Sequence, residues 1–505
     1  MSDLLINDNQ EPLRGSGQLE NEEVQANPKP IHVTDIPLVA KSHEKSITSI
    51  PDVGILLDSL LPKLQPISYR EKAGIIDDKA KLENKHYIVL TVEEVLEAAL
   101  SQHYGLCMRN HSPYCYNGFY WQLVLPEELK HFLGKAAFKL GVKLIDAKWY
   151  HFRDDLLKQF MVSAHLPNIT SIKGGGLINF LNGTFEIKSQ KLREFRSKDF
   201  LTYQLPFAYD PDATAPMFHK YLDYVLPDEA SQMNIAEYIG YIFCNNDDLR
   251  LEQILLLTGG GGNGKSVLQM IIIALLGEHN VSCFSMEKLT DTTGNTRAEF
   301  ANKLANISSE MSNKLESSVF KQLASCEPVE ARALYGKPFI IKNYGKMIFN
   351  CNVLPTNVEL TEAFFRRWLI IEFGRTITQA EKDVQLPMKI INNELSGVFN
   401  WVLAGLNRLL DQKDFTSNPK AEAKKLEFQR LSNNVAQFID DESYTSDVDA
   451  IIPQMEVYEQ YVTYCRDNGC IKCSSKVFGN RLEKLGITRS KRNVGMVLHM
   501  AKKDL

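Results

Sequence analysis

Residues 259–266 have the composition and spacing of a phosphate-binding loop. Their sequence, GGGGNGKS, fits the pattern G-x-x-x-x-G-K-[ST]. The apolar segment QILLLTG leads into the loop and SVLQMIIIALLG continues from it, which predicts the strand–loop–helix arrangement of a P-loop. Glycines let backbone N–H groups converge on phosphate oxygens, and the N-terminus of the helix favours negative charge. The predicted ATP-binding residues are Gly259, Gly260, Gly261, Gly262, Asn263, Gly264, Lys265 and Ser266.

Two side chains of this loop indicate nucleotide chemistry in particular. Lys265 is expected to act catalytically by neutralising the β- and γ-phosphates of ATP, and Ser266 is expected to bind Mg²⁺. The alternative is a glycine-rich turn before a core helix, which needs neither a lysine nor a serine at these positions. The predicted cofactors are therefore ATP and Mg²⁺.

Glu310 ends the segment KLANISSE and is the next candidate catalytic residue. A carboxylate at the C-terminal end of an apolar strand can orient the attacking water and support the metal ion. Ser309 stands where many P-loop motors have a second acid, which puts metal support at that position in doubt. The alternative is that Glu310 begins a solvated helix.

Asn352 ends the apolar part of KMIFNCNVLP, at residues 346–355. An amide at the end of a strand can donate to the γ-phosphate or to the attacking water, and so detect hydrolysis. The alternative is that Asn350 and Asn352 only form the turn after the strand.

Arg366 and Arg367 precede the apolar segment WLIIEF. An arginine that reaches the nucleotide of a neighbouring subunit stabilises charge on the transferring phosphoryl group. The sequence does not separate the two arginines, and a solvated pair at a helix end is the alternative.

The order of apolar segments divides the chain into five parts. Strands alternate with helices around the loop, which favours a largely parallel, three-layer α/β core. Residues 1–68 contain no aromatic residue, so a flexible tail is expected there, with a short recruiting helix at 54–64. Asn-Gly pairs at 117–118 and 182–183 predict two hairpins. The predicted parts are an N-terminal arm (1–84), an α+β domain (85–215), the ATPase (216–380), a helical linker (381–429) and a small helical domain (430–505).

Bulk properties limit the class of protein. The formal net charge of −5 argues against a protein that coats nucleic acid by overall charge. No secretory signal is visible, and the longest apolar run, at residues 270–277, is too short to span a membrane. Nine cysteines, an odd number in a large chain, are typical of reduced thiols. We expect a cytoplasmic protein with no membrane partner, in a bacterial host.

The motifs in this order resemble the superfamily 3 helicases, a branch of the AAA+ ATPases, and most of all the phage, plasmid and poxvirus-type primase-helicase family. The resemblance rests on the glycine-rich loop, the short interval to Glu310, the N-x-L-P segment and the arginine pair. It covers residues 175–375, and NFLNGTFEI followed by FLTYQLPFAYDPDA is similar to the family's lead-in to the motor. The resemblance implies an α/β fold: an AAA+ P-loop core flanked by an α+β domain and a winged-helix-like domain.

The resemblance also implies a ring with DNA in its channel. Similar helicases carry a DNA-gripping hairpin before the strand that ends in the asparagine, and RALYGK at 332–337 matches it here. Lys337 is then expected to contact phosphate and Tyr335 to pack on sugar or base, with Lys342 in a second turn as a lower-ranked contact. An exposed hairpin with solubilising lysines is the alternative. A trans-acting arginine implies ATP between subunits, and therefore a homo-oligomer, most simply a hexamer.

The last 35 residues are basic in a chain of negative net charge. Residues 471–505 hold nine Lys and Arg and two acidic residues, and SSKVFGNRLEKLG is a candidate recognition helix. This segment resembles the winged-helix domain that follows the motor in related proteins, and a basic helical lid is the alternative. The predicted DNA contacts here are Lys476, Arg481, Arg489, Lys491 and Arg492.

These features together predict an ATP-dependent, ring-forming DNA helicase for replication of a phage or mobile genetic element. Its partners would be single-stranded and forked DNA, other copies of itself, and a replication protein bound by the N-terminal arm. The resemblance implies 3′→5′ movement, and no primer synthesis is expected. The alternatives are an origin-binding initiator that melts DNA without processive unwinding, and a P-loop ATPase that does not act on DNA.

Overall fold

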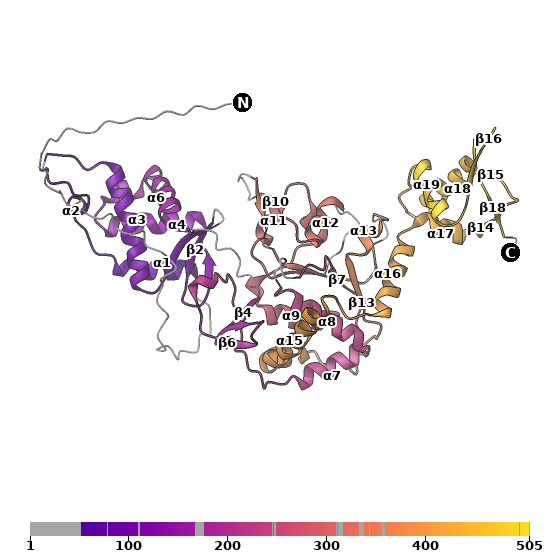
Figure 1. The fold of residues 1–505 in the computed structure, drawn as a ribbon, viewed down its shortest axis with the longest axis horizontal. Helices are drawn as coiled ribbons and strands as arrows, with labels where there is room; N and C mark the ends of the chain where they lie inside the picture. The colour runs from indigo at the N-terminus through magenta and orange to yellow at the C-terminus, as the bar shows by residue number, and fades with distance from the viewer. Residues whose placement is uncertain are drawn as a thin grey trace, which may run out of the picture.

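The computed structural model of the protein describes most of the chain from residue 52 onward. The described residues are 52–77, 79–109, 112–166, 176–244, 246, 249–309, 311, 317–332, 338–342, 344–355, 359–493 and 495–503. Figure 1 shows three units in chain order, with the helix α16 (Pro419–Leu431) leading from the central unit to the C-terminal one. Among the described residues, no helix is both long and apolar enough to cross a membrane.

The N-terminal unit packs helices around a three-stranded antiparallel sheet. The sheet order is β1–β2–β3, and its second hairpin turns at the Asn-Gly pair at 117–118, as predicted. The elements are α1 (Val53–Leu60), η2 (Leu61–Lys63), α2 (Tyr69–Lys72), α3 (Asn84–Ser101), β1 (Gly105–Arg109), β2 (Ser112–Tyr116), β3 (Trp121–Leu123), α4 (Pro126–Lys139), α5 (Leu144–Lys148) and α6 (Tyr150–Ser163).

The predicted N-terminal arm is too long by some thirty residues. Leu57, Leu60 and Tyr69 are buried in one core with Val92 and Leu156. The helix expected at 54–64 is therefore present as α1, but its apolar face covers the N-terminal unit rather than a partner, because leucines one turn apart fall on one side of a helix. Residues 1–51, which include the rest of the predicted arm, lie outside the described residues.

A five-stranded parallel sheet forms the centre of the molecule. Its order is β13–β7–β12–β9–β8, and every neighbouring pair is parallel. Leu255 and Leu257 pack on the face that α9 covers, whereas Ile254 and Leu256 pack on the opposite face. The strands are apolar on both faces, as burial between two layers requires. The strands are β7 (Ile254–Thr258), β8 (Val281–Ser282), β9 (Ala305–Ser308), β12 (Lys346–Cys351) and β13 (Trp368–Glu372).

Two further sheets and twelve helical segments complete the central unit. The elements outside the parallel sheet are β4 (Leu177–Phe180), β5 (Gly183–Glu186), β6 (Lys191–Arg193), η3 (Ser197–Asp199), α7 (Pro216–Val225), α8 (Glu229–Tyr241), α9 (Lys265–Leu276), η4 (Glu278–Asn280), α10 (Met286–Thr290), α11 (Asn295–Phe300), α12 (Ser317–Ala324), β10 (Val329–Arg332), β11 (Pro338–Ile341), α13 (Glu362–Phe365), α14 (Leu386–Asn393), α15 (Leu395–Gln412) and α16. The hairpin predicted at the 182–183 turn is β4–β5.

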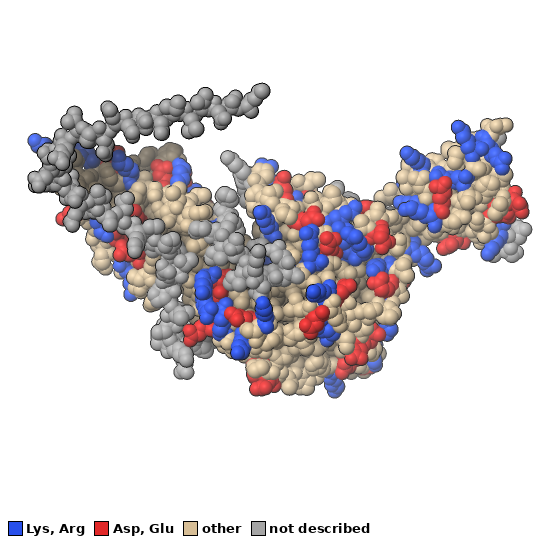
Figure 2. Space-filling view, viewed as in Figure 1, with Lys and Arg blue, Asp and Glu red and all other residues tan. Residues whose placement is uncertain are grey.

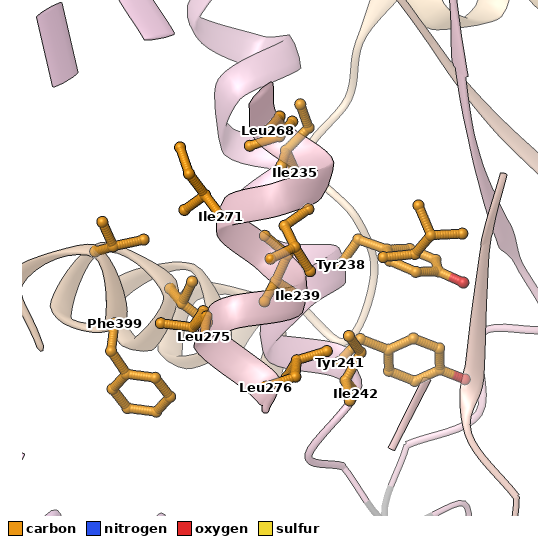
Figure 3. Close-up of a cluster of buried hydrophobic side chains, with 14 of the residues drawn as sticks. Ile235, Tyr238, Ile239, Tyr241, Ile242, Leu268, Ile271, Leu275, Leu276 and Phe399 are labelled. Carbon is orange, nitrogen blue, oxygen red and sulfur yellow. The ribbon is translucent and has the colours of Figure 1, made fainter. Parts of the chain in front are cut away.

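The segments predicted as a linker and as the end of the α+β domain belong to the central core. Figure 3 shows side chains of α8 and α9 meeting Phe399 of α15 in one cluster. A Cβ on Gly240 would lie 2.7 Å from Leu406 Cβ, and one on Gly405 would lie 2.6 Å from Ala236 Cβ. Glycines therefore let α8 and α15 approach closely. The same core contains Phe180 of β4, so the boundary after 215 was misplaced, and 381–429 is no separate linker.

The C-terminal unit has its own small core. Phe438, Tyr461 and Phe478 are buried together from three different helices. A strand pair, β16–β17, follows the last helix, and β15 pairs with the other side of β17. The elements are α17 (Asn434–Asp441), β14 (Tyr444–Ser446), β15 (Ile452–Pro453), α18 (Gln454–Asp467), α19 (Ser475–Lys484), β16 (Arg489–Arg492), β17 (Gly495–Leu498) and β18 (Met500–Lys502).

Candidate functional site

The loop at 259–266 joins the end of β7 to the start of α9, as the sequence predicts. Gly259, Gly261, Gly262 and Gly264 all have positive φ, which L side chains adopt only at a cost. A Cβ on Gly259 would lie 2.4 Å from the carbonyl oxygen of Phe373, so this position also has no room for a side chain. At position 259, glycine is therefore required both by backbone conformation and by packing.

Lys265 is buried inside this loop. Its Nζ donates to the carbonyl oxygen of Gly259 at 2.7 Å and to Oδ1 of Asn263 at 3.1 Å. Burial lowers the pKa of the Lys265 ammonium below its ordinary value, because both acceptors are neutral. The site thus holds a positive charge that a phosphate would compensate.

Neighbouring elements hold the loop in place. Nδ2 of Asn263 donates to the carbonyl oxygen of Phe373 at 3.0 Å, just after β13. The backbone N–H of Ile377 donates to the carbonyl oxygen of Gly262 at 2.7 Å. The hydroxyl of Tyr221, on α7, donates to the carbonyl oxygen of Gly264 at 2.8 Å. The loop is therefore fixed from three directions before any ligand binds.

A cavity of about 1060 Å³ opens beside the loop. Its volume is at the upper end of the range of small-molecule sites, so a nucleoside triphosphate has room there. Apolar residues of α7 and α14 form one wall, and the carboxyl ends of β9 and β12 contribute polar groups. The lining includes Met217, Tyr221, Val225, Gly262, Lys265, Ser266, Ser309, Asn350, Asn352, Ile377, Leu386 and Pro387.

Three polar side chains meet at the cavity's sheet edge. Oγ of Ser309 donates to Oε1 of Gln269 at 3.0 Å, and Nδ2 of Asn350 donates to the same Oε1. Asn350 was considered in the sequence only as a turn former, and Gln269 was not singled out. The available signal for Gln269 is its spacing, because it lies one helical turn after Lys265 and hence on the same side of α9.

The structure describes two of the three remaining residues predicted for the site. Asn352 is exposed, follows the last residue of β12 and lines the cavity, near where the sequence expects it. Ser266 is exposed at the start of α9 and also lines the cavity. Glu310 lies outside the described residues. Roles for all three stay predictions.

The structure separates the two arginines that the sequence leaves equivalent. The Arg366 side chain is 58% exposed and contacts Oε2 of Glu252 at 3.3 Å. Arg367 is buried: it also contacts Glu252, and it donates to Oγ of Ser325 at 3.0 Å and to the Ala363 carbonyl oxygen. Burial lowers the pKa of the Arg367 guanidinium. Arg367 therefore links buried parts of the fold, whereas the Arg366 guanidinium lies at the surface in an ion pair with Glu252.

An antiparallel hairpin lies where the channel hairpin is predicted. Strands β10 and β11 pair from Val329↔Ile341 to Arg332↔Pro338. Lys342 follows β11 and is exposed. Tyr335 and Lys337 belong to the segment between the strands, which lies outside the described residues.

The five predicted DNA contacts of the C-terminal unit fall into two groups. Figure 2 shows Lys and Arg side chains gathered on this unit. Lys476, Lys491 and Arg492 are exposed. Arg489 instead pairs with Glu483 at 2.7 Å, and NH1 of Arg481 donates to Oδ1 of Asn434 at 3.2 Å. The exposed three are therefore the better candidates for contacting a ligand.

Three family models match parts of the chain. Residues 257–367, which include the candidate loop, match a model described as a family of unknown function, DUF5906. Residues 97–227 match one described as D5 N terminal like, and residues 430–494 match one described as Poxvirus D5 protein-like. The D5-type matches thus lie on both sides of the segment that carries the loop.

Viral proteins are similar to parts of the chain. "Putative helicase L207/L206" of Acanthamoeba polyphaga mimivirus is 24% identical over 241 residues, which are 44% of this chain and 24% of that protein. The similarly named 121R of Invertebrate iridescent virus 3 is 22% identical over 322 residues, 56% of this chain and 34% of that protein. These findings support a D5-type helicase family. The chain spans a quarter to a third of the length of these D5-type relatives.

Solved structures of the NrS-1 C terminal region align with much of this chain. The apo structure of the NrS-1 C terminal region (305-718) is 13% identical, with a TM-score of 0.46, and covers 84% of this chain and 100% of that one. An A form of the same region has a TM-score of 0.44 at 13% identity, covering 81% and 98%. At TM-scores below 0.5, neither likeness carries an inference about this chain.

Proposed function

We propose that this protein is an ATP-dependent, ring-forming DNA helicase of the superfamily 3, AAA+ type. One observation carries the proposal: the glycine loop, with buried Lys265, and polar groups that follow β9 and β12 line one large cavity. A triphosphate placed there has backbone donors and an ammonium on one side, and side chains able to hold a water on the other. The similarity to D5-type and helicase-named viral proteins supports DNA replication as the process in which the helicase acts.

Each catalytic role falls to a named residue. Lys265 would bind the β- and γ-phosphates, Glu310 would orient the attacking water, and Asn352 would bond the γ-phosphate. Ser266 fits a Mg²⁺ ligand, because its hydroxyl oxygen is a hard donor at the cavity's edge and Mg²⁺ prefers such donors. When bound, Mg²⁺ would neutralise charge on the phosphates.

Arg366 would complete the site of a neighbouring subunit. It lies at the start of β13, whereas the segment that follows β13 bonds the P-loop of its own subunit. An exposed guanidinium at this position favours a homo-oligomeric ring with ATP between subunits, most simply a hexamer. Strand β13 would then link the nucleotide bound by each subunit to Arg366, which the same subunit contributes to the site of its neighbour.

DNA would meet two surfaces. In the channel, Tyr335 and Lys337 of the segment between β10 and β11 would grip one strand, and Lys342, which follows β11 at the other end of the hairpin, would add a weaker contact. On the C-terminal unit, α19 and the β16–β17 pair would act as recognition helix and wing of a winged-helix-like domain. There Lys476, Lys491 and Arg492 would contact phosphates.

The exposed basic groups of the C-terminal unit favour a second candidate function. An initiator would use them to bind origin DNA and would use ATP to assemble and melt the duplex, leaving processive unwinding to another protein. Both functions serve replication of a phage or mobile genetic element, and in both the N-terminal arm would bind a replication partner.

Strand displacement separates the two functions. We expect the full chain, with ATP and Mg²⁺, to unwind a forked duplex that has a 3′ single-stranded tail for loading, and not one with only a 5′ tail. The same substrate with a fluorophore and quencher at the fork reports the rate, and a reaction without ATP is the control. Opening confined to a few base pairs of a blunt duplex, with no displacement of a forked strand, would favour the initiator instead.

A further inference from the structure

Strand pairing brings Asn350 beside Ser309 at the carboxyl edge of the parallel sheet. Strands β12 and β9 are parallel with Phe349 opposite Ser308, so the next residue on each strand is also adjacent. Gln269, on α9, accepts hydrogen bonds from both side chains with a single oxygen, Oε1. Three elements that are far apart in the sequence therefore bring one polar side chain each together, and two of these, Ser309 and Asn350, line the cavity.

The second polar atom of the Asn350 amide has no such partner. Asn350 is 5% exposed, and among the residues that the structure describes its buried Oδ1 has no hydrogen-bond partner. A buried acceptor of this kind is rare in folded proteins and calls for an explanation. Because Oε1 of Gln269 can only accept, it holds the NH₂ group of Asn350 and leaves Oδ1 as a free acceptor. Asn350 lines the cavity beside the P-loop, which places its side chain next to the proposed nucleotide site.

The sequence lacks an acidic residue at position 309. Ser309 occupies the position where many P-loop motors have an acid that supports the metal ion, and a serine hydroxyl that donates to Gln269 cannot supply a carboxylate. We propose that Oδ1 of Asn350 takes over this task by accepting a hydrogen bond from a water molecule of the nucleotide-bound Mg²⁺. Gln269 is then a positioning residue that fixes the orientation of the Asn350 amide. This inference rests on the proposed ATP site.

The test measures the Mg²⁺ requirement of nucleotide binding, which needs no hydrolysis. A fluorescent, non-hydrolysable ATP analogue is bound to the full chain at increasing Mg²⁺ concentrations. Asn350→Leu is expected to raise the Mg²⁺ concentration for half-maximal binding about tenfold, as loss of a group that hydrogen-bonds a metal's ligand does at other metal sites. Gln269→Ala should shift it in the same direction by less, because Asn350 remains but is no longer oriented.

A conservative replacement distinguishes this role from a structural one. Asn350→Asp keeps an acceptor oxygen at the same place and adds a negative charge, so it should return the Mg²⁺ requirement to the wild-type value or below. Thermal unfolding of each variant checks that it folds. If Asn350→Leu folds and binds the analogue with an unchanged Mg²⁺ requirement, the inference is wrong while the ATP site stands. If the wild type binds no analogue at any Mg²⁺ concentration, the proposed function itself fails.

Discussion

Replacing Arg366 with alanine is expected to lower the rate of ATP hydrolysis by the assembled protein about 10³-fold, the lower end of the contribution of arginine fingers. Nucleotide binding to the same subunit should change little, because Arg366 lies at the opposite end of β13 from the P-loop contacts. Its ion pair with Glu252 lies at the surface and contributes little stability. Steady-state hydrolysis and analogue binding, measured side by side, check both parts.

Arg367→Ala is the matched control, since the two arginines are neighbours with opposite environments. Arg367 is buried and bonds Glu252, Ser325 and the Ala363 carbonyl group, so its loss leaves buried acceptors unpaired. We expect the free energy of unfolding to fall by roughly 1–3 kcal/mol, read from thermal or denaturant unfolding. Arg366→Ala should leave the unfolding midpoint within error of wild type.

Mixing subunits tests whether Arg366 acts in trans. A preparation of Arg366→Ala combined with one that cannot bind ATP, such as Lys265→Met, should recover part of the activity that each lacks alone. In the mixed ring, an intact P-loop of one variant faces an intact arginine of the other. Unchanged activity of Arg366→Ala in the assembled state, or loss of activity only with Arg367→Ala, would contradict the assignment.

The second large effect is expected for Lys265→Met. Loss of the ammonium should reduce ATP hydrolysis by at least about 10²-fold, the cost of removing one charge-stabilising group from an active site. It should also remove the stabilisation that ATP gives: for the wild type at a ligand concentration 100 times Kd this is about 2.7 kcal/mol. Thermal unfolding with and without Mg²⁺–ATP measures the difference.

Without nucleotide, the same variant should be about as stable as the wild type, because relief of the buried charge offsets the loss of two hydrogen bonds. Lys265 buries a positive charge against two neutral acceptors, and burial lowers its pKa, so folding works against the charged form. The cost is present at pH values below the ordinary lysine pKa, and methionine removes it. A Lys265→Met protein that is markedly less stable without ligand would show instead that the lysine holds the loop together.

The P-loop could be predicted from the sequence because its signal is local. Strand, glycines, lysine and helix are contiguous in the chain, and the positive φ values at Gly261, Gly262 and Gly264 are what a run of glycines allows. The two hairpins were predicted for the same reason, since an Asn-Gly pair determines a turn within a few residues.

The missed features depend on residues that are distant in sequence. Gln269 and Asn350 are 81 residues apart and meet only because the sheet order places β12 next to β7. Arg366 and Arg367 both pair with Glu252, and they differ because Arg367 is buried and also bonds Ser325 and the Ala363 carbonyl oxygen. The domain boundaries were misplaced because the apolar face of α15 is buried on α8, and a helix pattern does not reveal which element covers it.

The most direct test of the helicase proposal is ATP hydrolysis by the full chain with and without single-stranded DNA, at low salt, for wild type and Lys337→Ala. Lys342→Ala is the paired variant, because Lys342 carries the same charge beside the same hairpin. We predict that DNA stimulates the wild type, that Lys337→Ala hydrolyses ATP but is no longer stimulated, and that Lys342→Ala loses less. A wild-type rate that does not respond to DNA would contradict the proposal and favour an ATPase that acts on a protein or a small molecule.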